Sequence, residues 1–244
     1  MEELARTRGG YAYPWRSEVA PGNGEDAYTA AVTAALRPDA VVIEAGCGHG
    51  PDIPRFAPSV ARYIAYDYAR GFVEIARRTT TTLALDNVTL HAVDSSPERG
   101  GRIPADDRSV DLIVSRRGPT NFILDARRVL RDGGRMIQLN PVPWMPPWNL
   151  DVPEGLRVRA EPDIEPRIGQ RLRAAGFKFA SAERFDVPEY LPDAEALWKC
   201  LAWLKDDAPA FSEVRGTLED LFADHAGPRG LELRHCRFLW SADA

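Results

Sequence analysis

A glycine-rich turn that directly follows a short apolar run constrains this chain more than any other feature. Residues 41–43 are Val-Val-Ile, and residues 44–50 are Glu-Ala-Gly-Cys-Gly-His-Gly. Glycines at this spacing allow a tight turn from a strand into a helix and let a ligand approach the backbone. The pattern predicts a ligand-binding turn at the carboxyl end of a buried strand.

Four further apolar runs follow, each ending in a polar residue, with helical patterns between them. They are Tyr63–Tyr66 before Asp67, Val88–Val93 before Asp94, Val110–Val114 before Ser115 and Met136–Leu139 before Asn140. Alternation of near-continuous apolar strands with helices predicts an α/β fold, in which a parallel sheet is covered on both faces. The ligand crevice of such a sheet lies outside the carboxyl ends of its strands. The polar residues are therefore expected to meet there.

The residues around the turn indicate what kind of ligand binds. Pro51 occupies the position at which a dinucleotide-binding pattern has glycine, and Glu44 is expected to face the site. A carboxylate repels a pyrophosphate but accepts hydrogen bonds from an ammonium group, so a nucleoside with a cationic tail is predicted. Asp67 is placed to accept from ribose hydroxyls, and Asp94 with Ser95 from an adenine amino group. The alternative for each single acid is that it caps the following helix.

The ordered set of motifs over about residues 40–140 resembles the class I S-adenosylmethionine-dependent methyltransferases, especially the small-molecule and type 11 group. The resemblance implies S-adenosylmethionine as the cofactor. It also implies a Rossmann-like, seven-stranded, mostly parallel sheet with helices on both faces and an antiparallel last strand. The implied cofactor contacts are Glu44, Ala45, Gly46, Cys47 and Gly48 at the amino-acid end, Asp67 at the ribose, Tyr68, Asp94 and Ser95 around the adenine, and the backbone of Ser115 and Arg116 beside the methionine sulfur.

Two features distinguish this chain from members of the family that it resembles: the prolines after the glycine-rich turn and the residues at the positions of metal ligands. Pro51 suits the first position of a helix, but Pro54 and Pro58 do not suit a helix interior, so a short or irregular helix is predicted after the turn. Ser115 and Asn140 stand where metal-dependent relatives would have acids. The pairs Cys47/His49 and His235/Cys236 are not spaced as closed zinc sites, so no metal is expected.

Three zones are predicted within a single compact domain. Residues 1–39 form a helical lead-in, with a helix over about Gly24–Leu36 and an aromatic strap of Tyr11, Tyr13 and Trp15. Residues 40–140 form the cofactor-binding core, and residues 141–244 complete the sheet on the substrate side. The Pro-rich stretch 141–153, with Trp144 and Trp148, is either a substrate wall or a core plug. Two inserted helices, around Leu197 and Leu218, form core or a substrate lid.

The expected function is methyl transfer from S-adenosylmethionine to an O or N atom of a small molecule. No catalytic residue is predicted, and conceivable general bases are His49, His225, His235, Tyr13 and Tyr190. The alternatives are an RNA base methyltransferase, a non-catalytic S-adenosylmethionine-binding subunit and a nicotinamide dehydrogenase. The net charge of −5 and the lack of a basic module argue against nucleic acid as a partner.

The apolar runs and the cysteines indicate where in the cell the protein is expected. No apolar run has the length of a membrane span or the pattern of a signal peptide. Three widely separated cysteines give no disulfide framework, so a cytoplasmic setting with no membrane contact is expected.

Overall fold

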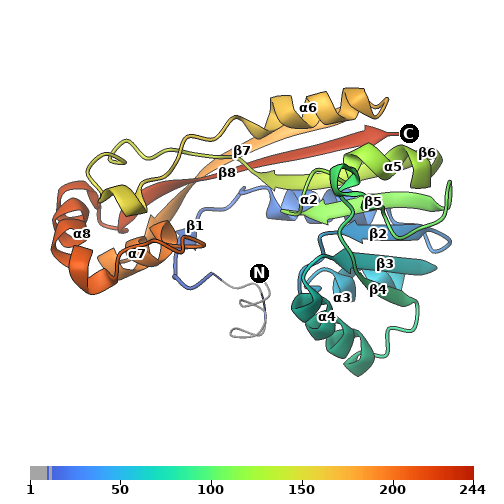
Figure 1. The fold of residues 1–244 in the computed structure, drawn as a ribbon, viewed down its shortest axis with the longest axis horizontal. Helices are drawn as coiled ribbons and strands as arrows, with labels where there is room; N and C mark the ends of the chain where they lie inside the picture. The colour runs from blue at the N-terminus through green and yellow to red at the C-terminus, as the bar shows by residue number, and fades with distance from the viewer. Residues whose placement is uncertain (1–9, 11–12) are drawn as a thin grey trace.

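An eight-stranded sheet organises the chain, and its strands are drawn as arrows in Figure 1. The computed structural model describes residue 10 and residues 13–244, so the predicted contribution of Tyr11 to an aromatic strap lies outside the described residues. The strand order is β1-β7-β8-β6-β5-β2-β3-β4. The strands are β1 (Glu18–Val19), β2 (Val41–Ala45), β3 (Arg62–Asp67), β4 (Val88–Ala92), β5 (Val110–Arg116), β6 (Leu130–Pro141), β7 (Phe179–Leu191) and β8 (Leu231–Asp243).

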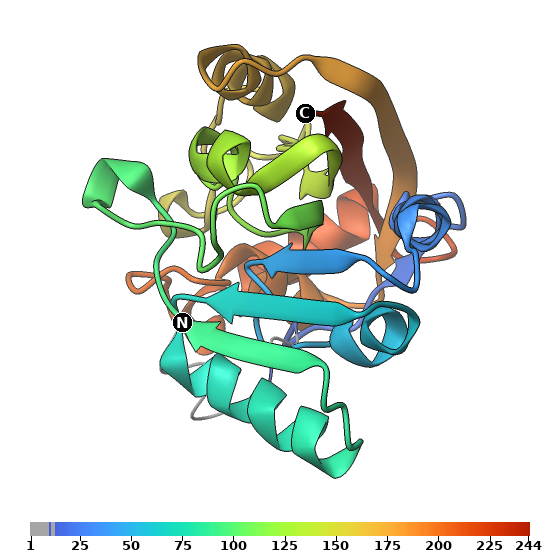
Figure 2. The ribbon, with the colours of Figure 1, turned by 90° about the vertical axis from the view of Figure 1, so that its right-hand side faces the viewer.

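The predicted fold class is confirmed. Strands β2 to β6 pair in parallel, and the last strand, β8, is antiparallel to both β6 and β7. The neighbouring arrows of β2, β3 and β4 point the same way in Figure 2. The described sheet has one strand more than the seven expected, because Glu18 and Val19 pair with Tyr190 and Glu189 along the edge of β7. A two-residue strand leaves too short a pattern to be recognised from sequence.

Helices cover both faces of the sheet, as predicted. Because side chains alternate along a strand, Val42 belongs to one core and Ile43 to the other. The first core lies under α2, α3 and α4, and the second under α5 and α6. The helices are α2 (Glu25–Ala35), α3 (Ile53–Phe56), α4 (Arg70–Thr82), α5 (Ile123–Val129), α6 (Ile164–Ala174), α7 (Ala194–Leu201) and α8 (Phe211–His225).

The segment after the glycine-rich turn is irregular, and this prediction is confirmed. Helix α3 has four residues and is followed by a 3₁₀ turn, Ala57–Ser59. Pro54 and Pro58 each fall in the first turn of their own short helix, where a missing backbone N–H leaves no helical hydrogen bond unmade. Splitting the segment in two thus accommodates both prolines.

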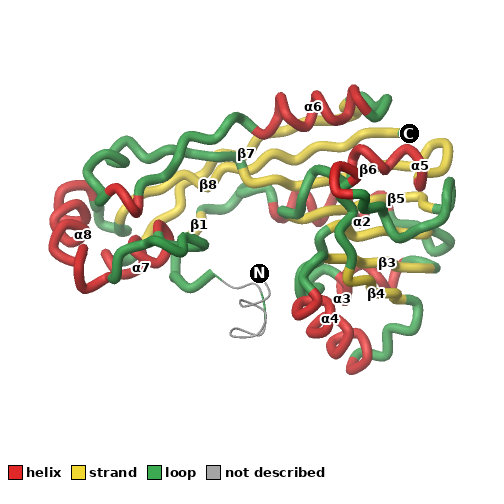
Figure 3. Tube along the Cα trace, in the orientation of Figure 1, coloured by secondary structure: helices red, strands yellow, loops and turns green. Residues whose placement is uncertain are grey.

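The C-terminal part of the chain builds a third core away from the parallel strands. Strands β7 and β8 extend beyond the parallel strands of the sheet toward α7 and α8, as the yellow strands and red helices of Figure 3 show. Leu197 of α7 and Leu218 of α8 are fully buried there, with Trp148 from the Pro-rich stretch. The division of the chain into three zones stays a prediction. No helix among the described residues is long and apolar enough to span a membrane.

Candidate functional site

A cavity of about 360 Å³ lies at the carboxyl ends of β2, β3, β4 and β5. Strand β2 has β3 on one side and β5 on the other, and the connections leave it in opposite directions. This is the switch point at which α/β sheets bind ligands. Eight of the eleven residues predicted to contact a cofactor line the cavity: Gly46, Cys47, Gly48, Asp67, Tyr68, Asp94, Ser95 and Arg116.

The glycine-rich turn forms one wall of this first cavity. The backbone nitrogens of Gly46 and Cys47 donate to the carbonyl of Tyr66 at 2.9 and 3.0 Å, which fixes the turn to β3. Gly46 has a φ of +71°, and a Cβ placed on it would lie 2.6 Å from Cδ of Pro119. Gly48 also has a positive φ, but a Cβ there would meet nothing within 4 Å. The turn thus needs glycine at 46 for space and leaves open room beside Gly48.

Asp67 joins the turn to the segment that follows β3. Its Oδ2 accepts from the backbone nitrogen of Gly48 at 3.0 Å, and its Oδ1 accepts from that of Ala69 at 2.9 Å. The N-cap of α4 is Ala69, so Asp67 braces the entry to this helix without being its cap residue. Two backbone groups thus hold the carboxylate of Asp67 in place at the cavity wall.

Asp94 forms the opposite wall. Its carboxylate accepts from Nε of Arg99 at 2.6 Å and from the backbone nitrogen of Ser96 at 2.9 Å. These hydrogen bonds, that from Arg99 first, hold the pKa of Asp94 well below its usual range. Ser95 beside it is buried, while the ring of Tyr68 is 59% exposed. A permanently charged acceptor and an exposed aromatic face are thus available on this side.

Three predicted contacts lie outside the cavity, and strand geometry explains why. Glu44 shares a strand face with Val42, so its side chain enters the core under α2 and not the cavity. There Oη of Tyr63 donates to its Oε2 at 3.0 Å, and burial, followed by nearby Asp52, raises the pKa of Glu44 to about 8. Glu44 therefore supports the turn from below, which corrects the expectation that it faces the ligand.

Ala45 and Ser115 also lie beneath the cavity floor. Both are fully buried, and Oγ of Ser115 donates to the carbonyl of Ala45 at 2.7 Å. Nε2 of Gln138 donates to the same Ser115 hydroxyl at 3.2 Å. These bonds join β2, β5 and β6 at the switch point of the sheet. Ala45 and Ser115 therefore stabilise the floor of the cavity and do not line it.

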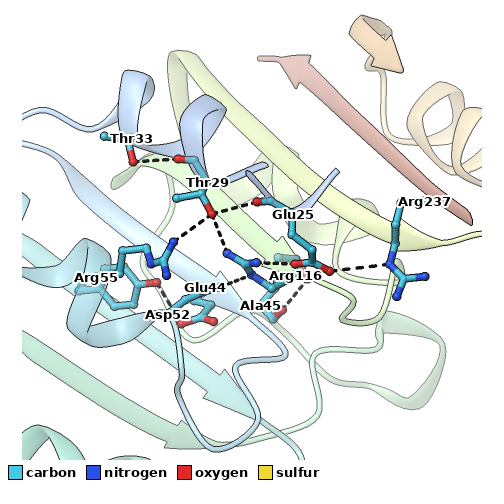
Figure 4. A network of polar contacts seen from close by, with 11 residues as sticks. Glu25, Thr29, Thr33, Glu44, Ala45, Asp52, Arg55, Arg116 and Arg237 are labelled. Carbon is cyan, nitrogen blue, oxygen red and sulfur yellow. Dashed lines mark hydrogen bonds and ion pairs between the residues drawn. The ribbon is translucent and has the colours of Figure 1, made fainter. Parts of the chain in front are cut away.

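Arg116 borders the cavity, but its side chain is committed elsewhere, as Figure 4 shows. Its Nε donates to Asp52 at 2.8 Å and its Nη2 to Thr29 at 3.0 Å, and its Nη1 forms an ion pair with Glu25. The guanidinium also lies 4.6 Å from the ring centroid of Tyr28. The backbone of Arg116 is thus the part available to a ligand. This network was not predicted from the sequence, although Asp52, the acid directly after Pro51, was a visible signal of it.

A second, larger cavity of about 710 Å³ adjoins the first. Trp144 lines it, so this tryptophan forms a wall, whereas Trp148 is buried in the third core and acts as a plug. Helices α7 and α8, both fully described, contribute no residue to either cavity and are packed in the third core. The residues that line both cavities are Arg99, Arg117, Gly118, Pro119, Asn121 and Pro141.

Two of the five conceivable bases lie in the first cavity, His49 and Tyr13. Burial, followed by the charge of Arg117, lowers the pKa of His49. His235 is instead paired with Glu189 at 3.0 Å, and neither it nor His225 or Tyr190 lines either cavity. Within residue 10 and residues 13–244, no group of three or more His, Cys, Asp or Glu side chains has the arrangement of a metal site.

This chain resembles a known protein family and several solved structures. Residues 42–134 match the family model of a methyltransferase domain. A solved structure of a functionally unknown protein from Deinococcus radiodurans R1 is 26% identical, with a TM-score of 0.71, and the match covers 99% of this chain and 97% of that one. A candidate methyltransferase from Bacillus halodurans C-125 is 19% identical, with a TM-score of 0.61, over 88% of this chain and 97% of that one.

One curated relative also matches. It is an uncharacterised 37.1 kDa protein in transposon TN4556 of Streptomyces fradiae, 34% identical over 110 residues. The match covers 43% of this chain and 31% of that protein, so the aligned region is about a third of the relative's length.

Proposed function

We propose that this chain, which belongs to the class I S-adenosylmethionine-dependent methyltransferases, transfers a methyl group from S-adenosylmethionine to an O or N atom of a small molecule. The observation that carries the proposal is the pairing of the two cavities. The first presents the glycine turn, Asp67 and Asp94 at the switch point of the sheet, and the second opens beside it. One cavity for the methyl donor and one for the acceptor is what such a reaction requires.

The residues of the first cavity fit S-adenosylmethionine. Asp67 offers anchored acceptors to ribose hydroxyls, Asp94 stays ionised beside the exposed ring of Tyr68, and Gly48 leaves open room by the turn. The bound cofactor supplies an activated methyl group on a sulfonium. The protein then has to align the acceptor and exclude water, which accounts for much of the acceleration in reactions of this kind.

The methyl group would pass between the cavities where they share a wall. Arg117, Asn121 and Pro141 belong to both linings, and Gly118 stands between the floor and this junction. A Cβ on Gly118 would lie 2.5 Å from Oγ of Ser115 and 2.7 Å from the carbonyl of Ala45. A larger residue would push this backbone into the passage, so we propose that Gly118 keeps it open.

The test is transfer of labelled methyl groups to a fractionated metabolite extract. We expect label in a small-molecule fraction, with turnover unaffected by a chelator. Label in RNA would favour the RNA methyltransferase alternative. Tight binding of S-adenosylmethionine with label in no fraction would instead identify a non-catalytic binding subunit, and would contradict the proposal.

A further inference from the structure

The second cavity is basic although the chain carries a net charge of −5. Its lining includes five arginines against two glutamates, Glu98 and Glu161, both of which are exposed. The arginines come from three places: the loop after β4, the segment after β5, and the stretch that leads into and through α6. They are Arg99, Arg117, Arg159, Arg167 and Arg171.

Four of these guanidinium groups are not neutralised by the protein. Arg99 is paired with Asp94, but Arg117, Arg159 and Arg167 form no ion pair with any carboxylate of the described residues. Arg171 donates to the hydroxyl of Thr120, a neutral partner. Elsewhere in the chain arginines such as Arg128 and Arg184 are each held by two acids. The cavity lining thus carries four guanidinium groups that have no carboxylate partner among the described residues.

Asn140 adds a buried donor to this lining. It stands at the end of β6 and is 2% exposed. Nε1 of Trp240, which can only donate, bonds to its Oδ1 at 2.9 Å, and this fixes which way the amide faces. Its Nδ2 is left without a partner among the described residues. This nitrogen is not sealed in the interior, so it can donate to a molecule in the cavity.

The backbone of Arg117 supports the same conclusion. Its φ is +59°, a left-handed conformation that residues with side chains seldom adopt, and its backbone nitrogen donates to the carbonyl of Leu139 at 2.7 Å. Strained conformations of this kind concentrate at ligand sites. Here the strain places an uncompensated guanidinium at the junction of the two cavities.

We propose that the methyl acceptor carries an anionic group, a carboxylate or a phosphate, next to an apolar body. Arg117, Arg167 and Arg171 bind the anion with Asn140 as a neutral donor, because guanidinium forks match the oxygens of both groups. The apolar body packs against Val142, Trp144 and Val158 of the same lining. This inference rests on the proposed function, since it assigns the acceptor of that same site.

The test uses aromatic probes in matched pairs on the full chain saturated with S-adenosylhomocysteine. Phenyl phosphate is compared with phenol, and benzoate with benzamide, by calorimetric titration. We expect at least one anion to bind about tenfold more tightly than its neutral counterpart, as charge-assisted bonds predict. Whichever anion prevails distinguishes phosphate from carboxylate as the recognised group.

Three variants locate the binding. Arg167→Gln should weaken anion binding by about threefold to tenfold, because this guanidinium is exposed and partly screened. Asn140→Asp keeps the bond from Trp240 but replaces the free donor with an acceptor, so it should weaken anion binding at least as much. Arg173→Gln, the same change on the same helix outside the cavity, should have no effect.

The outcomes separate this inference from the proposed function. Equal affinity for anion and neutral probe, no anion binding at millimolar concentrations, or equal losses in Arg167→Gln and Arg173→Gln would overturn it, while binding of S-adenosylhomocysteine in the same samples leaves the proposed function standing. Failure of S-adenosylhomocysteine itself to bind would count against the proposed function. Thermal melting checks that Asn140→Asp is folded, and Arg167→Gln tests the claim independently.

Discussion

Asp67 has two roles that the sequence presented as alternatives. Its oxygens brace the glycine turn and the entry to α4, and the same oxygens face the first cavity. A structural role and the proposed ligand-binding role thus fall on one residue. The consequence is that a substitution here acts on stability and on affinity together.

For Asp67→Asn we expect both effects. The amide nitrogen would face the N–H of Gly48 or Ala69, so the unfolding free energy should fall by about 1 kcal/mol. Loss of a charged acceptor for the ribose should weaken S-adenosylmethionine binding by about tenfold or more. Melting and calorimetry measure the two, with the exposed Asp206→Asn as the control. Unchanged affinity in folded Asp67→Asn protein would remove Asp67 from the cofactor site.

Glu44 gives the chain a predictable dependence on pH. Burial raises its pKa from the ordinary value of 4.5 to about 8, so between these values the folded state holds a proton that the unfolded state has released. The free energy of unfolding therefore falls as the pH rises through this window and levels off above it. Glu44→Gln cannot titrate, but its carbonyl still accepts from Tyr63.

We expect Glu44→Gln to match the wild type near the acid end of that window and to be more stable at its alkaline end, by on the order of 4 kcal/mol. Urea denaturation at a series of pH values measures the difference. Parallel stability curves for the two proteins would show that Glu44 is ionised in the folded chain.

At the scale of elements, most of the sheet was predictable and its edges were not. The runs before Asp67, Asp94 and Ser115 became β3, β4 and β5 because buried parallel strands are apolar along their whole length. Strand β7 runs as far as Leu191, paired with β8. Pairing along an edge depends on backbone partners far apart in the chain, which no local pattern encodes.

The residues of the site also divide into some that were predictable from the sequence and some that were not. Residues that follow directly on a strand, such as Gly48 and Asp67, were placed correctly at the cavity by their position alone. Glu44 and Ser115 stand on the strands themselves, where alternation of side chains decides between cavity and core. The second cavity depends on α6 approaching the ends of β5 and β6, a contact that no local sequence pattern indicates.

The Arg116 network should be the strongest polar link between α2 and the sheet. Its side chain is 14% exposed and that of Asp52 is 6% exposed, so removing one partner leaves a buried charge. Arg116→Gln should lower the unfolding free energy by about 2–4 kcal/mol. In Arg116→Gln/Asp52→Asn the loss should be smaller than the sum of the single losses.

Arg135→Gln is the matched control, because its ion pair with Asp243 is 47% exposed on each side. We expect a change there of no more than about 1 kcal/mol. Equal losses in Arg116→Gln and Arg135→Gln by chemical denaturation would contradict the role assigned to the network.

At the scale of the whole molecule, the buried residues of the third core line neither cavity, although Trp144 and Val158, which pack against that core, line the second cavity. Leu197 of α7 is fully buried in that core. Leu197→Ala should therefore cost about 2–4 kcal/mol of stability and leave the affinity for S-adenosylmethionine unchanged. Denaturation and calorimetry on the same sample measure both. A large loss of affinity in the folded variant would mean that α7 and α8 act on the site after all.

The first cavity is expected to bind a nucleoside with a cationic tail and to exclude a dinucleotide. With Glu44 in the core and Asp94 paired with Arg99, the carboxylate of Asp67 and Pro51 after the turn are the features that disfavour a pyrophosphate there. Parallel calorimetric titrations of the purified chain with S-adenosylmethionine and NAD test this most directly. We expect saturable binding of S-adenosylmethionine and far weaker binding of NAD, and NAD binding as tightly as S-adenosylmethionine would show that the cofactor assignment is wrong.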